Sequence, residues 1–193
     1  MPQPIYIIVA GVNGAGKSTL YQTDPDLFLN THRLNADEIL RNNGGDWHLL
    51  KDNLAAMRQE VTLLHQALNR RESVHIETTL AGNGNTHLKL IQKAHQQDFE
   101  VYLLYVSLEN VQLALDRVQE RINKGGHGIA PELIKKRYKQ SLNNLIPISA
   151  EVDQVKIFDN TQKLKLVYAR NHQKVVENNL TSFPWLPPEL PMK

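Results

Sequence analysis

Residues 11–18 read Gly-Val-Asn-Gly-Ala-Gly-Lys-Ser and match the pattern G-x-x-x-x-G-K-S/T at every fixed position. They directly follow residues 5–10, a continuous apolar run that is typical of a strand buried on both faces. A buried strand, a glycine-rich turn and a helix that starts at Lys17 form the context this pattern requires. The pattern therefore predicts an α/β sheet whose first strand ends in a phosphate-binding loop.

The composition of this loop follows from the chemistry of phosphate binding. Backbone N–H groups must approach phosphate oxygens closely, and glycine has no Cβ atom to block them. The helix that follows directs its positive end at the phosphates. We expect Lys17 to hold the β- and γ-phosphates of ATP and the Ser18 hydroxyl to ligate Mg²⁺. The expected nucleotide-binding residues are Gly11, Asn13, Gly14, Ala15, Gly16, Lys17, Ser18 and Thr19.

Apolar runs and helical stripes alternate along the rest of the chain. Strands are expected at residues 5–10, 74–79, 100–107, 155–158 and 164–168, with a less apolar one at 31–35. One long helical stripe has alternating spacings of four and three: Leu50, Leu54, Met57, Val61, Leu64 and Leu68. The alternation predicts a P-loop fold of the NTPase and kinase type: a mainly parallel sheet of about five strands with helices on both faces.

Composition and length narrow the alternatives. The 193 residues include no cysteine, which excludes a disulfide scaffold, a thiolate metal site and a cysteine nucleophile. A net charge of +2 gives no argument for nucleic-acid binding. The apolar run at 5–10 is too short to span a membrane and lacks the features of a signal peptide, so we expect a cytoplasmic protein. We expect one domain at 1–180 and a proline-rich tail at 181–193, where neither a helix nor a central strand can continue.

Asp37 follows the expected second strand within the segment 35–39, Asn-Ala-Asp-Glu-Ile. In open parallel sheets, ligand-binding groups gather at the carboxyl ends of the strands. Asp37 would there face the γ-phosphate and could accept a proton from a substrate hydroxyl. It could equally cap a helix that begins at Glu38. Spacing alone leaves both interpretations open.

Glu77 interrupts an apolar run at the end of another expected strand. Burying a carboxylate is costly unless it has a partner, and a substrate hydroxyl or a Mg²⁺-bound water would be a suitable one. A salt bridge at the rim of the sheet explains the residue equally well.

Basic residues follow the strand at 100–107. Arg117 and Arg121 share one face of the next helix, residues 125–128 (Gly-Gly-His-Gly) interrupt it, and Arg137 lies on the helix after that. Two arginine-bearing helices around a flexible hinge are typical of a lid that closes on triphosphate charge. Because acidic residues lie close by, the pattern alone favours a solvated, salt-bridged face instead.

Four segments together resemble the zeta toxins: residues 11–19, 35–39, 76–80 and 117–145. The resemblance implies an ATP-dependent kinase that phosphorylates a hydroxyl of a small molecule. In better-studied members this molecule is UDP-N-acetylglucosamine, phosphorylated at the 3′-hydroxyl of the amino sugar. The resemblance also implies an antitoxin protein as a partner.

The same resemblance assigns roles to individual residues. It makes Asp37 the general base, with Glu77 and Thr79 in contact with the substrate. Lys17 and Ser18 hold the triphosphate and Mg²⁺, Arg121 and Arg137 neutralise the phosphoryl group in transfer, and Asn160 lies at the edge of the adenine.

Two alternatives remain open from the sequence. The same scaffold could phosphorylate a nucleoside, an antibiotic or a polynucleotide end, although the near-neutral charge is unfavourable for the last. A nucleotide-dependent binding module without phosphoryl transfer would also carry a P-loop. The strand at 100–107 ends without the aspartate that many P-loop ATPases use for Mg²⁺, and this disfavours motor proteins.

Overall fold

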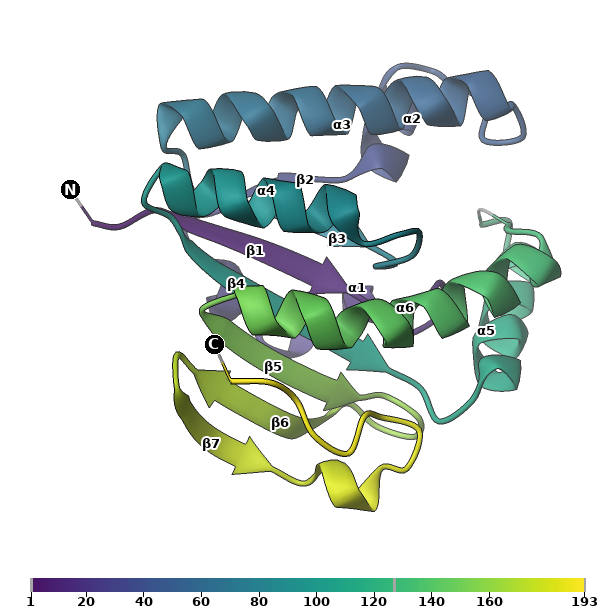
Figure 1. The fold of residues 1–193 in the computed structure, drawn as a ribbon. Coiled ribbons are helices and arrows are strands. Elements are labelled where there is room, and N and C mark those ends of the chain that lie inside the picture. The colour runs from purple at the N-terminus through teal and green to yellow at the C-terminus, as the bar shows by residue number, and fades with distance from the viewer. Residues whose placement is uncertain (1, 127, 193) are drawn as a thin grey trace.

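The computed structural model describes residues 2–126 and 128–192, so that His127 of the expected hinge lies outside the described residues. Its centre is a seven-stranded sheet with the order β2-β3-β1-β4-β5-β6-β7 (Figure 1). Five strands are parallel: β1 (Ile5–Ala10), β2 (His32–Leu34), β3 (Val74–Thr78), β4 (Glu100–Ser107) and β5 (Gln154–Asp159). Two antiparallel strands extend it: β6 (Lys165–Asn171) and β7 (Lys174–Asn178).

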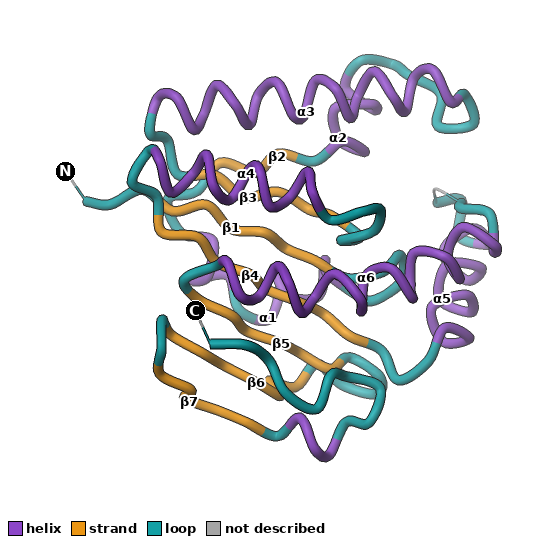
Figure 2. Tube along the Cα trace, in the orientation of Figure 1, coloured by secondary structure: helices purple, strands orange, loops and turns teal. Residues whose placement is uncertain are grey.

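Helices cover both faces of the sheet, as the sequence predicted (Figure 2). One face carries α3 (Leu50–Arg70), α4 (Asn85–Gln96) and α6 (Pro131–Glu151). The other carries α1 (Lys17–Thr23) and α5 (Val111–Asn123), whereas α2 (Ala36–Asn42) packs against α3. Within residues 2–126 and 128–192, no helix is long and apolar enough to cross a membrane.

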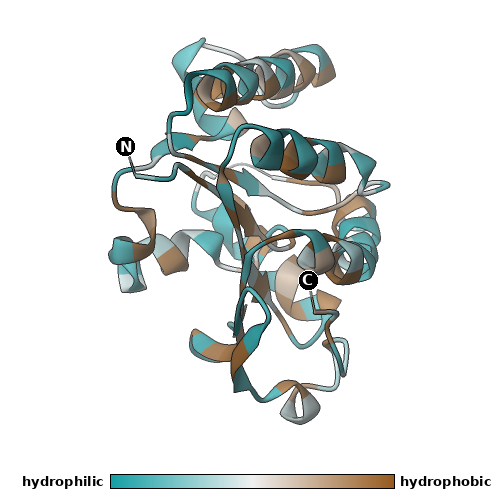
Figure 3. Ribbon diagram, turned by 60° about the vertical axis from the view of Figure 1, so that its left-hand side comes forward, coloured by the Kyte–Doolittle hydropathy of each residue, from teal (hydrophilic) through white to brown (hydrophobic). Residues whose placement is uncertain are grey.

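The central strand β1 is apolar throughout because both of its faces are buried. Tyr6 and Ile8 pack into the core under α3, α4 and α6, while Ile7 and Val9 pack into the core on the α1 and α5 side. Successive side chains of a strand point to opposite faces, so a strand between two helical layers needs an apolar residue at every position. Figure 3 shows the resulting hydrophobic centre of the sheet. This packing fixes the place of the loop that follows β1.

The number of strands differs from the sequence prediction of about five. The parallel strands are confirmed, and so is the strand expected at 164–168, which is β6. The missed strand, β7, lies at the edge of the sheet and most of its side chains are exposed. An edge strand with two solvated faces needs no apolar alternation, so the pattern that reveals other strands is absent.

The proline-rich tail packs on the body of the molecule. Phe183 and Trp185 lie edge to face, with ring centroids 5.3 Å apart, and both contact the core on the α6 side. Leu186 is buried in the same core. In Figure 1 the tail crosses beside β5 and β6 in yellow. The division into a domain at 1–180 and a separate tail at 181–193 stays a prediction.

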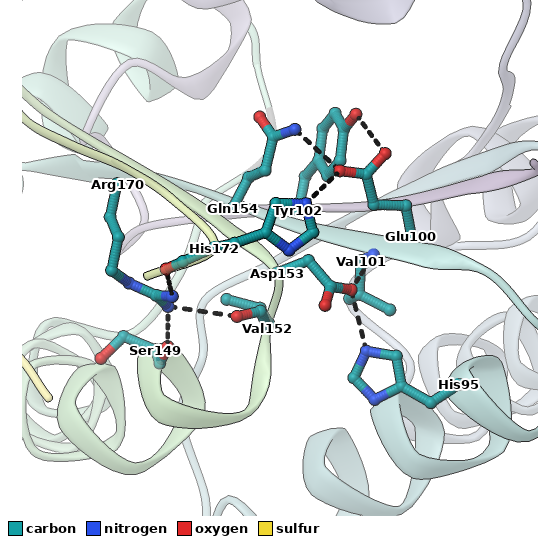
Figure 4. A network of polar contacts seen from close by, with 10 residues as sticks. All are labelled: His95, Glu100, Val101, Tyr102, Ser149, Val152, Asp153, Gln154, Arg170 and His172. Atoms are coloured by element: carbon teal, nitrogen blue, oxygen red, sulfur yellow. Dashed lines mark hydrogen bonds and ion pairs between the residues drawn. The ribbon is translucent and has the colours of Figure 1, made fainter. Parts of the chain in front are cut away.

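A buried arginine joins the sheet to the C-terminal end of α6 (Figure 4). Arg170 on β6 is only 2% exposed, and its guanidinium donates hydrogen bonds to the carbonyl oxygens of Ser149 (2.5 Å), Val152 (3.1 Å) and His172 (2.5 Å). These carbonyls lie at the end of α6 and in the turn after β6, where the backbone has few partners of its own. Arg170 therefore satisfies polar groups that would otherwise be buried alone.

We predict that Arg170→Leu lowers the free energy of unfolding by about 2–4 kcal/mol, because it leaves these buried carbonyls without donors. Urea unfolding followed by circular dichroism measures the change. The matched control is Arg70→Leu, which alters an exposed arginine in the last turn of α3 and is expected to cost at most about 0.5 kcal/mol. Equal effects of the two substitutions would contradict this role of Arg170.

Candidate functional site

The loop between β1 and α1 is held in shape by glycines that no other residue could replace. Gly11, Gly14 and Gly16 have φ angles of 142°, 83° and 93°, which side-chain-bearing residues rarely adopt. Neighbours also press on each position. A Cβ atom at Gly11 would overlap a carbonyl oxygen of β4, one at Gly14 would lie 2.7 Å from a carbonyl oxygen of α5, and one at Gly16 would overlap the Asn160 side chain. The loop is therefore a preformed cradle of backbone N–H groups.

Asn160 braces this loop from the end of β5. Its Nδ2 atom donates a hydrogen bond to the Ala15 carbonyl at 2.9 Å, and its side chain is buried. Arg117 on α5 in turn donates to the carbonyl oxygens of Asn160 (2.9 Å) and Thr161 (3.1 Å). This contact across the sheet is visible only in the structure. The contact with adenine that was assigned to Asn160 stays a prediction.

Lys17 lies within electrostatic range of four of the predicted site residues. Its Nζ atom donates a hydrogen bond to the Gly11 carbonyl at 2.7 Å. Burial lowers the pKa of Lys17 to about 8; Glu77 and Asp37 oppose this shift, while Arg121 and Arg137 add to it. All four charged groups therefore lie close enough to act on the same ammonium. Segments between residues 17 and 137 thus converge at the carboxyl ends of the central strands.

Asp37 lies in the first turn of α2 and is exposed. The N-cap of this helix is Asn35, whose Oδ1 accepts hydrogen bonds from the backbone N–H groups of Asp37 (2.9 Å) and Glu38 (3.1 Å). The interpretation of Asp37 as the helix cap is therefore wrong. The role of general base stays a prediction, and the position of the carboxylate near Lys17 and Arg137 favours it.

Glu60 is a site residue that the sequence analysis missed. It lies on α3, and its Oε1 atom accepts a hydrogen bond from the backbone N–H of Ala36 at 3.0 Å. Burial raises the pKa of Glu60 to about 7; the hydrogen bond opposes the shift, while Asp37 and Glu77 contribute to it. Glu60 therefore holds the start of α2, and with it Asp37, against α3. This contact was missed in the sequence analysis because Glu60 and Ala36 lie on different helices, and no local sequence pattern relates them.

Glu77 forms an ion pair with Arg33, which also pairs with Glu38 at 2.8 Å. The Glu77 side chain is largely buried at the end of β3. The salt bridge that the sequence left as an alternative is thus present. Thr79 is half-buried directly after the strand. A substrate contact from Glu77 or Thr79 stays a prediction.

The arginines on α5 and α6 have different surroundings. Arg137 donates a hydrogen bond to the Asn13 Oδ1 atom at 2.9 Å, which joins α6 directly to the glycine-rich loop. Arg121 is exposed and faces a cavity, as described next. The solvated-face alternative does describe the outer side of α5, where Lys124 and Glu120 form an exposed pair at 2.5 Å. Arg137 thus contacts the glycine-rich loop and Arg121 lines the cavity beside Asp37, while a lid that closes on the triphosphate stays a prediction.

A cavity of about 500 Å³ opens beside Asp37, between the α2–α3 connection and the end of α5. Its lining combines one carboxylate, two arginines and an aromatic ring, so it could take a polar molecule with a ring and negative charge. Its walls are formed by Asp37, Leu40, Arg41, Gly45, Trp47, Arg121, Gly125 and Gly126. Trp47 was not singled out in the sequence because its place depends on how two distant loops meet. A second cavity, of about 560 Å³, lies between the β5–β6 turn and the tail, away from every predicted catalytic residue.

The donor set suits a magnesium ion held together with a nucleotide. Among the described residues no cluster of three or more histidine, cysteine, aspartate or glutamate side chains could hold a metal by itself. Mg²⁺ usually keeps waters and phosphate oxygens and needs few protein ligands. The exposed Ser18 in the first turn of α1 offers one hydroxyl beside the backbone cradle, and this fits that requirement.

Known proteins are similar to this chain in sequence or in fold. A family model described as Zeta toxin matches residues 1–173. A protein of Haemophilus influenzae described as uncharacterized is 31% identical over 132 residues, which are 68% of this chain and 91% of that protein. A solved structure from the PezAT chromosomal toxin-antitoxin system of Streptococcus pneumoniae is similar with a TM-score of 0.63 and 20% identity, over 88% of this chain and 72% of that one. A chain of the Pnkp1/Rnl/Hen1 RNA repair complex is similar with a TM-score of 0.60 and 18% sequence identity, over 75% of this chain and 46% of that one. At these identities the two structures show a shared fold.

We predict that Gly16→Ala weakens ATP binding at least about 100-fold, because the new methyl group displaces Asn160 and distorts the cradle. Isothermal titration calorimetry measures the affinity. Gly82 is a matched control, since its φ angle of 91° is nearly that of Gly16 but no atom lies within 4 Å of a Cβ placed there. Gly82→Ala should carry a similar backbone strain of about 1–3 kcal/mol and leave ATP affinity unchanged. If both variants bound ATP equally well, the tight packing of the loop would not govern binding.

Proposed function

The chain belongs to the zeta toxin family of P-loop kinases, and we propose that it transfers the γ-phosphoryl group of ATP to a hydroxyl of a small molecule. UDP-N-acetylglucosamine is the acceptor to test first, because the family membership suggests it. The observation that carries the proposal is the preformed phosphate cradle, which Lys17 and Arg137 both contact and which lies within electrostatic range of Asp37 and Arg121.

The chemistry needs two things that this arrangement would supply: positive charge around the phosphates and a group that accepts a proton. Lys17, Arg121 and Arg137 place positive charge around the phosphates, where it counters the negative charge of the transition state. Asp37 accepts the proton of the attacking hydroxyl. A bond forms between that hydroxyl oxygen and the γ-phosphorus, the bond from the γ-phosphorus to the β–γ bridging oxygen breaks, and ADP leaves.

The remaining residues bind and position. Ser18 would hold Mg²⁺, which when bound neutralises phosphate charge. The cavity beside Asp37 would take the acceptor, and Asn160 would border the adenine. Glu77 and Thr79 do not line this cavity, and their contact with the substrate is taken from the family resemblance. Glu60 keeps α2 in place through the Ala36 N–H, so it acts on the reaction only through the position of Asp37.

Family membership also supports a partner and a location. We include in the proposal an antitoxin protein that binds the chain and a cytoplasmic site of action, where ATP is available as donor. The structure from the PezAT system belongs to a toxin-antitoxin pair, and this is the basis for naming that class of partner.

We predict that Asp37→Asn lowers phosphoryl transfer by about 10²–10⁴-fold while ATP binding remains, because the amide cannot accept the proton. The measurement is a mass-spectrometric search for products formed from ATP, Mg²⁺ and a panel of acceptors. The panel contains UDP-N-acetylglucosamine, other nucleotide sugars, nucleosides, aminoglycosides and a 5′-hydroxyl oligonucleotide. The wild type should add one phosphate to UDP-N-acetylglucosamine.

The matched control is Asp116→Asn, which removes an exposed carboxylate on α5 that accepts a hydrogen bond from Gln112. It should keep full activity. A phosphorylated acceptor other than UDP-N-acetylglucosamine would change the substrate and keep the mechanism. Full transfer by Asp37→Asn to any acceptor would remove Asp37 from the role of base.

We predict that ATP affinity falls as the pH rises above about 8, because Lys17 loses its proton there and its positive charge with it. A bound triphosphate favours the charged form, so binding takes up a proton and the dissociation constant rises by up to about tenfold per pH unit. Calorimetric titrations between pH 7.5 and 9.5 measure this, a range in which the phosphates of ATP are already ionised.

Lys17→Ala is the control for this pH dependence. It should bind ATP weakly and with a nearly constant affinity over the same range. A flat profile for the wild type would mean that the ammonium of Lys17 keeps its ordinary pKa or does not contact the nucleotide.

A further inference from the structure

The first half of α3 exposes an apolar stripe. The sequence pattern describes one continuous stripe along this helix, but only its second half faces the core, where Leu64 and Leu68 are almost fully buried. Single exposed apolar residues are common on protein surfaces, whereas a contiguous row of large ones marks an interaction site. The exposed members are Leu50 (72%), Leu54 (41%), Met57 (53%) and Val61 (37%).

The neighbouring face of the helix explains why this stripe is left uncovered. Ala56 is buried and Glu60 binds the backbone of Ala36, so α2 packs on the face that carries these two residues. At 100° per residue, Ala56 and Glu60 lie roughly 80–120° around the helix from Leu50. The stripe therefore lies beside the α2 contact and outside it.

Charges border the stripe asymmetrically. Lys51 and Arg58 are exposed and seven residues apart, about 80–100° from Leu50 on the side away from α2. His65 continues the same row one heptad further on and lies 2.9 Å from the Lys93 ammonium. The acidic residues of this segment, Asp52 and Glu60, lie on other sides and accept hydrogen bonds from backbone N–H groups. The outer border of the stripe is thus basic.

We propose that the first half of α3 is a docking surface for an amphipathic helix of a partner protein whose apolar stripe is bordered by acidic residues. Spacings of four, three and four are those of the a and d positions of a coiled coil, which fit one facing helix. The acidic border of the partner complements Lys51 and Arg58. This inference does not depend on the reaction that the protein catalyses.

Two other occupants fit the observations less well. A second copy of this chain, packed antiparallel, would bring the Lys51 and Arg58 rows of the two helices together, and like charges repel. A lipid surface needs a wide apolar face, whereas these four residues span only about 60° of the helix. Both remain distinguishable outcomes of the experiment below.

The test uses the full chain and two labelled synthetic helices of about three heptads. Both have leucine at the a and d positions; one has glutamate at the flanking positions and the other lysine. Fluorescence anisotropy should show that the glutamate peptide binds at least about tenfold more tightly. Leu54→Glu and Met57→Glu should each weaken it about tenfold or more, and Arg58→Glu should reduce or reverse the preference between the peptides. Gln66→Glu, an exposed change on another side of α3, should have no effect.

Binding of neither peptide, or equal binding of both, would overturn the proposal. So would concentration-dependent self-association in sedimentation experiments that Leu54→Glu abolishes, since a second copy would then be the occupant. Binding to vesicles of anionic phospholipid that Leu54→Glu abolishes, without peptide binding, would assign the surface to a membrane. Thermal unfolding of each variant excludes loss of fold as the cause, because the substituted side chains are exposed in the native state.

Discussion

The glycine-rich loop after β1 is held by contacts on three sides, and the rest of the site depends on this. Its glycines adopt positive φ angles and press against β4, α5 and the side chain of Asn160. Asn160 binds the Ala15 carbonyl, and Arg117 holds the backbone of Asn160 from α5. The shape of the loop is therefore set by the packing of the sheet and helices before a nucleotide arrives. Such preorganisation spares the cost of ordering the loop on binding.

Charged side chains surround this loop, and a bound triphosphate would shift their pKa values. Burial and two arginines lower the pKa of Lys17, while burial and, to a smaller extent, nearby carboxylates raise that of Glu60. Each shift reflects a group held in an environment that disfavours its charged form. An anion bound against Lys17 would favour the ammonium, and strongly perturbed groups of this kind cluster at functional sites. The electrostatics thus point to the same place as the backbone cradle.

Which features of the fold and the site could be predicted from the sequence depends on how far apart in the sequence the interacting residues lie. The loop and β1 were predicted because a buried strand and a phosphate cradle have local residue requirements. The placement of Asp37 near Lys17 came from the topology of parallel sheets and from family resemblance. Glu60 and Trp47 were missed because their roles arise from contacts between distant segments, and β7 was missed because an exposed edge strand has no apolar pattern. The apolar stripe on α3 shows a further limit of prediction from sequence. Its periodicity identifies the apolar face of the helix, but it does not show which part of that face is buried by other elements.

The most direct test of the account is a crystal structure of the protein with a non-hydrolysable ATP analogue and Mg²⁺. We expect the γ-phosphate to lie against Lys17, with Arg121 and Arg137 beside it. We also expect the Asp37 carboxylate to lie within reach of an acceptor hydroxyl, at about 2.6–3.2 Å or through one water. A triphosphate bound elsewhere, or in the loop with Asp37 turned away from the γ-phosphate and separated from it by other side chains, would contradict the central claim.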